Sequence, residues 1–142
     1  MIVSQWHITV HTQPNDTRPG PVRQYNERQV ETLDVAAPIR SKPLPVTFDE
    51  AISTLESWNC LLVEPDGSLV WANSTGRPWC IDGQLQDGRD GLQYVEIKTN
   101  APRPPCEKLL TAFGIATEPL MVQLVLEGVF LSAATWLDLL DP

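Results

Sequence analysis

The distribution of proline divides this sequence into two parts. Of its 13 prolines, six fall within residues 12–45, where no apolar pattern is sustained. Proline lacks a backbone N–H and restricts the residue before it, so a helix cannot run through such a segment. We therefore interpret residues 1–45 as an N-terminal strand followed by a proline-rich arm or loop. Residues 46–142 then form a compact α+β body, and the whole chain is a single domain.

The N-terminal strand is indicated by alternation. Apolar and polar side chains alternate over residues 6–11, which is typical of a strand with one buried face. His7 and His11 share its polar face but lie too far apart along the strand to bind one metal, so we interpret them as an exposed pair. Within the arm, residues 30–36 alternate weakly and favour an edge strand.

Three helices are predicted in the body. Thr47 and Glu50 have the spacing of a capping box, and apolar residues follow at helical intervals over residues 48–58. A second helix is predicted over residues 105–113, where prolines fit the first turn. Ser132 is a suitable N-cap for a third helix near the C-terminus.

The remaining apolar runs predict strands. Residues 60–72 form one hairpin, and residues 81–86 and 92–99 form a second with a five-residue connection. Residues 120–126 and 129–131 are further strand candidates. The predicted fold class is therefore α+β, with a mainly antiparallel sheet of four to six strands and two or three packed helices.

Two apolar features have alternative interpretations. The five tryptophans are expected to be anchors of the core rather than a ligand cage, because their neighbours are apolar. The apolar stretch from residue 129 to residue 140 fits either the core or a homodimer surface, which leaves the oligomeric state open.

The net charge of −8 is concentrated in the body. Residues 1–45 hold five basic and four acidic side chains, which leaves five basic and 14 acidic side chains in residues 46–142. Such a body repels phosphate backbones and anionic membranes, so a membrane partner is not expected and nucleic acid is disfavoured without being excluded. Basic proteins, metal cations and neutral ligands suit it better.

Three cysteines, Cys60, Cys80 and Cys106, occur without a Cys-x-x-Cys pair. Their odd number favours reduced thiols over a disulfide framework. The first residues show no signal-peptide pattern, and no apolar run reaches the roughly 18 residues of a membrane span. A cytoplasmic location is therefore expected.

One hairpin carries a set of chemically useful side chains. If Gln86 lies opposite Leu92, Asp82 lies opposite Glu96, and Lys98 shares their face because side chains alternate along a strand. Two opposed carboxylates repel each other unless a cation lies between them. Mg²⁺ suits such carboxylates, and a nearby lysine can stabilise charge that develops on a substrate. The other interpretation is a solvated face on which Lys98 pairs with Asp82 or Glu96.

These residues resemble the core of the PD-(D/E)xK nuclease superfamily. Asp82 matches the acidic residue of the second strand, Glu96-Ile97-Lys98 matches the (D/E)xK tripeptide, and the order of elements over residues 47–126 is similar. Ile81 stands where the family has proline. The resemblance implies metal-dependent cleavage of a phosphodiester, with Asp82 and Glu96 as ligands of Mg²⁺ or Mn²⁺ and Lys98 positioning or activating the water.

Two functions remain in view. The small acidic body, the proline-rich arm and the lack of a stronger catalytic motif favour a non-catalytic protein-interaction or regulatory module, with a protein partner and no cofactor. The alternative is a metal-dependent nuclease-like domain, or a degenerate relative of one, with Asp82, Glu96 and Lys98 as its catalytic residues. We leave open at this point whether the chain is an enzyme.

Overall fold

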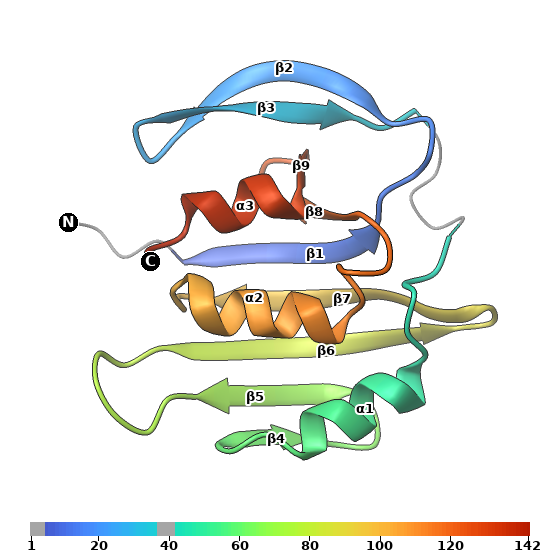
Figure 1. Ribbon diagram of the computed structural model, residues 1–142, viewed down its shortest axis with the longest axis vertical. Helices are drawn as coiled ribbons and strands as arrows, with labels where there is room; N and C mark the ends of the chain where they lie inside the picture. The colour runs from blue at the N-terminus through green and yellow to red at the C-terminus, as the bar shows by residue number, and fades with distance from the viewer. Residues whose placement is uncertain (1–4, 37–41) are drawn as a thin grey trace.

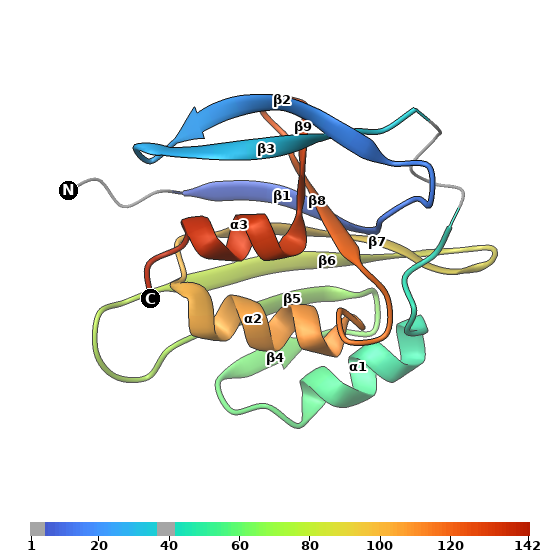
Figure 2. The same ribbon diagram turned by 45° about the horizontal axis from the view of Figure 1, so that its top comes forward.

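The computed structural model describes residues 5–36 and 42–142. They form one nine-stranded antiparallel sheet in the order β2-β3-β9-β8-β1-β7-β6-β5-β4. Three helices lie on the same side of this sheet (Figure 1 and Figure 2). The strands are β1 (Trp6–Thr12), β2 (Arg18–Tyr25), β3 (Arg28–Asp34), β4 (Leu61–Val63), β5 (Ser68–Ala72), β6 (Cys80–Gly88), β7 (Gly91–Thr99), β8 (Leu120–Leu124) and β9 (Val129–Ser132). The helices are α1 (Phe48–Glu56), α2 (Arg103–Ala112) and α3 (Ala133–Leu139).

β1 lies at the centre of the sheet, where it pairs with β7 on one side and with β8 on the other. Ile8 and Val10 of this strand are completely buried beneath the helices. Because side chains alternate along a strand, His7 and Thr9 lie on the helix-free face. The predicted N-terminal strand is confirmed. It connects the four strands β4, β5, β6 and β7 to the four strands β2, β3, β8 and β9.

The hydrophobic core lies between the sheet and the helices. Trp136 of α3 is its largest fully buried side chain, and the ring of Trp6 lies edge-on to it with 6.3 Å between the ring centroids. Of the five tryptophans expected in the core, Trp71 is also buried, whereas Trp6, Trp58 and Trp79 pack against the core and stay partly exposed. The C-terminal apolar stretch belongs to this core, since Leu131 and Leu137 are buried in it.

α1 and α3 begin where the sequence predicts, and α2 begins two residues before the predicted residue 105. The side chain of Thr47 accepts a hydrogen bond from the N–H of Glu50, whose carboxylate accepts from the N–H of Thr47. Ser132 caps α3 by accepting from the N–H of Thr135. α2 begins at Arg103, with prolines in its first turn. Within residues 5–36 and 42–142, no helix is long and apolar enough to cross a membrane.

The predicted number of strands was wrong, because the sheet has nine strands instead of four to six. β2 and β3 come from the segment interpreted as a proline-rich arm or loop. The edge strand predicted over residues 30–36 corresponds to β3, which pairs with both β2 and β9 and is therefore not an edge strand. β2 tolerates Pro19 and Pro21 because it is an edge strand. Asn26 and Glu27 have φ of 49° and 65°, as a tight two-residue hairpin turn requires, but the turn lacks the glycine that usually reveals it. Residues 37–41 of the predicted arm lie outside the described residues.

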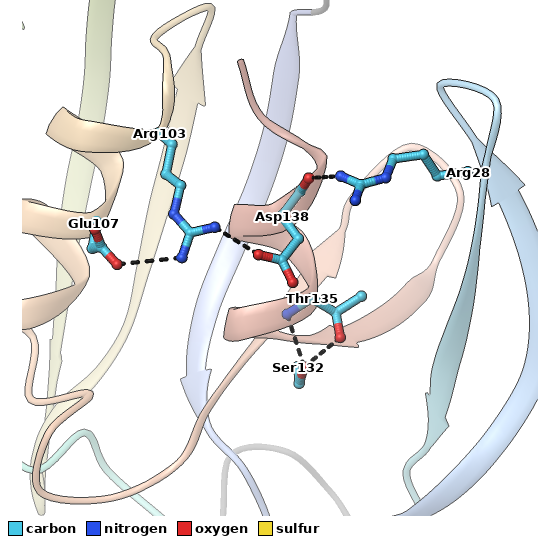
Figure 3. Close-up of polar contacts among 6 residues, drawn as sticks. All are labelled: Arg28, Arg103, Glu107, Ser132, Thr135 and Asp138. Atoms are coloured by element: carbon cyan, nitrogen blue, oxygen red, sulfur yellow. Dashed lines mark hydrogen bonds and ion pairs between the residues drawn. The ribbon is translucent and has the colours of Figure 1, made fainter. Parts of the chain in front are cut away.

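Polar contacts fasten the β2–β3 hairpin to the body. The hydroxyl of Tyr25 donates a hydrogen bond to the carboxylate of Glu127, with 2.5 Å between the two oxygen atoms. Glu127 lies in the connection between β8 and β9. The guanidinium of Arg28 donates to the backbone carbonyl of Asp138 in α3. The Asp138 carboxylate accepts a hydrogen bond from the Arg103 guanidinium at 2.6 Å, and the same guanidinium also contacts Glu107 (Figure 3). The hairpin, α3 and α2 therefore meet in one polar cluster.

The described end of the arm packs on the body before α1 begins. Leu44 is buried and donates its N–H to the carbonyl of Leu92. Pro45 packs against Gly114, where an added Cβ would lie 2.3 Å from the proline Cγ. Gly114 also has a φ of +99°, so both the backbone and the packing require glycine after α2.

The three cysteines are free. Cys60 is exposed, Cys80 is half-buried and Cys106 is buried. Burial raises the pKa of the Cys106 thiol to about 12, so this thiol stays protonated and unreactive at neutral pH.

The contact between Tyr25 and Glu127 predicts a pH dependence of hairpin docking. Burial, followed by the hydrogen bond and the charge of Glu127, raises the pKa of Tyr25 from 10.0 to about 12. Since the folded state holds this proton more tightly than the unfolded state, the contact stabilises the fold fully below pH 10. That stabilisation is lost as the pH rises from about 10 to 12. The measurement is phenolate absorbance in a Tyr94→Phe background, where Tyr25 is the remaining tyrosine.

Glu127→Gln in the same background is the matched variant. It removes the negative charge, so we expect the pKa of Tyr25 to fall toward that of the chain unfolded in urea. If Tyr25 has the same pKa in the folded chain that keeps Glu127 as in the unfolded chain, this result would contradict the contact.

Candidate functional site

A hollow of about 140 Å³ lies on the face of the sheet that carries no helix. Alternate residues of β6 and β7 belong to the buried core, so the residues between them face away from the helices. All three residues predicted as a site reach this hollow. Its lining consists of Asp82, Gly83, Gln84, Glu96 and Lys98.

The register across the hollow differs from the one inferred from the hairpin connection. Asp82 lies opposite Lys98, and Gln84 lies opposite Glu96. The expected opposition of Asp82 and Glu96 was therefore wrong by two residues. Two differences from the prediction each shift the register by one residue. β6 and β7 are joined by a two-residue turn instead of the predicted five-residue connection, and the pairing is irregular between Gln86 and Asp87. A shift of two residues keeps the side chains on one face, as predicted.

Glu96 has a partner that the sequence did not indicate. The imidazole Nε2 of His7 lies 2.7 Å from Oε2 of Glu96 and donates to the carboxylate. His7 lies in β1 opposite Lys98, so the central strand brings it to the edge of the hollow. Alternation alone placed His7 on this face, but its partner depends on a pairing between segments 89 residues apart.

Lys98 and Asp82 are exposed at the hollow. In the part of the chain that the structure describes, Lys98 forms no ion pair with Asp82 or Glu96, contrary to the alternative interpretation of a paired surface. Residues 5–36 and 42–142 contain no group of three or more His, Cys, Asp or Glu side chains arranged to hold a metal ion. Burial, and then the charge of Asp82, raise the pKa of the nearby Cys80 thiol, which makes it a poor nucleophile.

Two exposed apolar side chains adjoin the hollow. Val70 of β5 lies opposite Asp82, and Leu62 of β4 lies opposite Val70. Their exposed fractions are 45% and 65%, respectively. The sequence did not single them out, because a short apolar run does not show which of its residues face the core.

Comparison of the chain with protein-family models, with curated proteins and with solved structures finds no match. The functional argument therefore depends on the geometry of the chain itself. That geometry is a mixed-charge hollow beside an apolar pair, on the helix-free face of the sheet.

Proposed function

We propose that this chain is a non-catalytic protein-interaction module that binds a protein partner on the helix-free face of the sheet. The docking surface consists of the hollow together with Leu62 and Val70. The observation that supports this most strongly is the position of exposed Val70 directly opposite Asp82, with exposed Leu62 opposite Val70 on the next strand. Protein interfaces commonly combine an apolar centre with polar groups around it.

The charge of the body favours a basic partner. Residues 46–142 hold 14 acidic side chains against five basic ones. Within the hollow, the carboxylates of Asp82 and Glu96 outnumber the ammonium group of Lys98. Complementary charge accelerates association and suppresses wrong partners. A partner surface that combines lysine or arginine with apolar side chains matches this arrangement.

A short peptide that alternates lysine and leucine is a suitable probe of this surface. We expect its titration to shift the amide resonances of β4 to β7, because the peptide places ammonium groups near Asp82 and Glu96 and leucines on Leu62 and Val70. Asp82→Asn and Leu62→Ser should each weaken binding about three- to tenfold, as expected when one favourable interface contact is lost. Heteronuclear NMR titration measures both the location and the affinity.

Asp90→Asn is the matched control, since it removes an exposed acidic charge from the turn between β6 and β7 without touching the hollow. We expect this variant to bind like the parent chain. Equal losses in Asp90→Asn and Asp82→Asn would show that binding follows net charge alone and would contradict a defined docking surface.

Metal-dependent phosphodiester cleavage is a second candidate function, supported by the convergence of Asp82, Glu96 and Lys98 on one hollow. In the observed register the two carboxylates are diagonal neighbours, whose separation of about 7–8 Å at the backbone still allows long side chains to meet. Asp82 and Glu96 would hold Mg²⁺ or Mn²⁺, which would activate water, and Lys98 would stabilise developing charge. The hydrogen bond from His7 to Glu96 and the acidic body favour the non-catalytic function instead.

Mn²⁺ titration separates the two functions. For a non-catalytic module we expect no saturable paramagnetic broadening centred on Asp82 and Glu96, and no metal-dependent cleavage of single-stranded or duplex DNA. Broadening that disappears in Asp82→Asn, together with cleavage that disappears in Lys98→Ala, would overturn the proposed function in favour of the nuclease.

A further inference from the structure

Three tryptophans gather on the side of the sheet that carries the helices. Trp71 of β5 lies at their centre, with its ring centroid 5.0 Å from that of Trp58 and 5.2 Å from that of Trp79. Trp58 follows α1, and Trp79 directly precedes β6. The indole N–H of Trp71 donates to the carbonyl of Asn59 at 3.2 Å, which fixes the orientation of the central ring.

The ammonium group of Lys108, in α2, lies against these rings. Its Nζ is 4.4 Å from the ring centroid of Trp58 and 5.7 Å from that of Trp71. Lys108 is exposed, and it forms no ion pair with any carboxylate of the described residues. The electron-rich faces of the indoles are therefore what attracts its charge.

We propose that Trp58 and Trp71, supported by Trp79, recognise a lysine or arginine side chain of a protein partner, and that Lys108 occupies this site in the free chain. Trp58 is half-buried, so an incoming side chain can reach its ring. An exposed cation–π contact is weak, and a partner cation with additional contacts can therefore displace Lys108. The excess of acidic side chains in the body attracts such a cation.

This site is separate from the proposed docking surface. Trp71 lies on the core side of β5, whereas its neighbour Val70 lies on the helix-free face. Binding at one surface can therefore be measured in a variant that has lost binding at the other. Because Lys108 competes with an added cation for the same rings, removal of Lys108 must increase the apparent affinity of the site for that cation.

The peptide acetyl-Gly-Lys-Gly-amide, with acetyl-Gly-Gln-Gly-amide as the uncharged control, tests this site directly. We expect the lysine peptide to shift the indole resonances of Trp58 and Trp71 in a saturable way. Lys108→Gln should bind it about two- to fivefold more tightly, which is the range of an exposed cation–π contact. Trp58→Phe, which keeps an aromatic ring and so protects the fold, should bind it more weakly.

Arg89→Gln is the matched control, because it removes an exposed cation from the turn between β6 and β7, outside both the hollow and the tryptophan cluster. It should leave the indole titration unchanged. Equal affinity in Lys108→Gln and the parent chain, or the same indole shifts with the glutamine peptide, would overturn the proposal and show that the cluster only covers the core. If the tripeptide shifts the indoles while the lysine–leucine peptide leaves the amides of β4 to β7 unshifted, this site stands and the docking surface proposed above fails.

Discussion

Insertion of β1 between β7 and β8 is the interaction on which the rest of the structure depends. The chain forms β7 and β8 about 20 residues apart, with α2 between them, yet these strands do not pair with each other. β1 supplies hydrogen-bonding partners to both strands and places Ile8 and Val10 under the helices. Without it, two smaller sheets would each expose an unpaired edge and an apolar face.

The same strand divides the molecule into two chemically different sides. Its apolar residues help to hold the helices on one side, where the tryptophan cluster accommodates the ammonium group of Lys108. Its polar residues lie on the other side, where His7 orients Glu96 at the hollow. We propose that both surfaces bind cationic groups, through carboxylates on the helix-free face and through aromatic rings on the helix-bearing side.

Local signals in the sequence predicted local structure well. The Thr47 capping box, the Ser132 cap, the hairpin made by β4 and β5, and the shared face of Asp82, Glu96 and Lys98 all follow from neighbouring residues and are confirmed. The number of strands was not predictable in this way, because the tight turn at Asn26 and Glu27 lacks glycine and β2 contains prolines. The pairing of His7 with Glu96 depends on the insertion of β1, which no pattern within either segment encodes.

Native-state hydrogen exchange of the β1 amides tests most directly whether this strand holds the sheet together. In a central strand each amide is hydrogen-bonded to one neighbour or the other, so local fraying cannot expose the middle of β1. We predict that the amides of Ile8 and Val10 exchange only through global unfolding, with the same free energy as the most protected amides of β7 and β8. Exchange of Ile8 and Val10 through a smaller opening, while β7 and β8 stay protected, would show that the two halves of the sheet persist without β1 and would contradict this account.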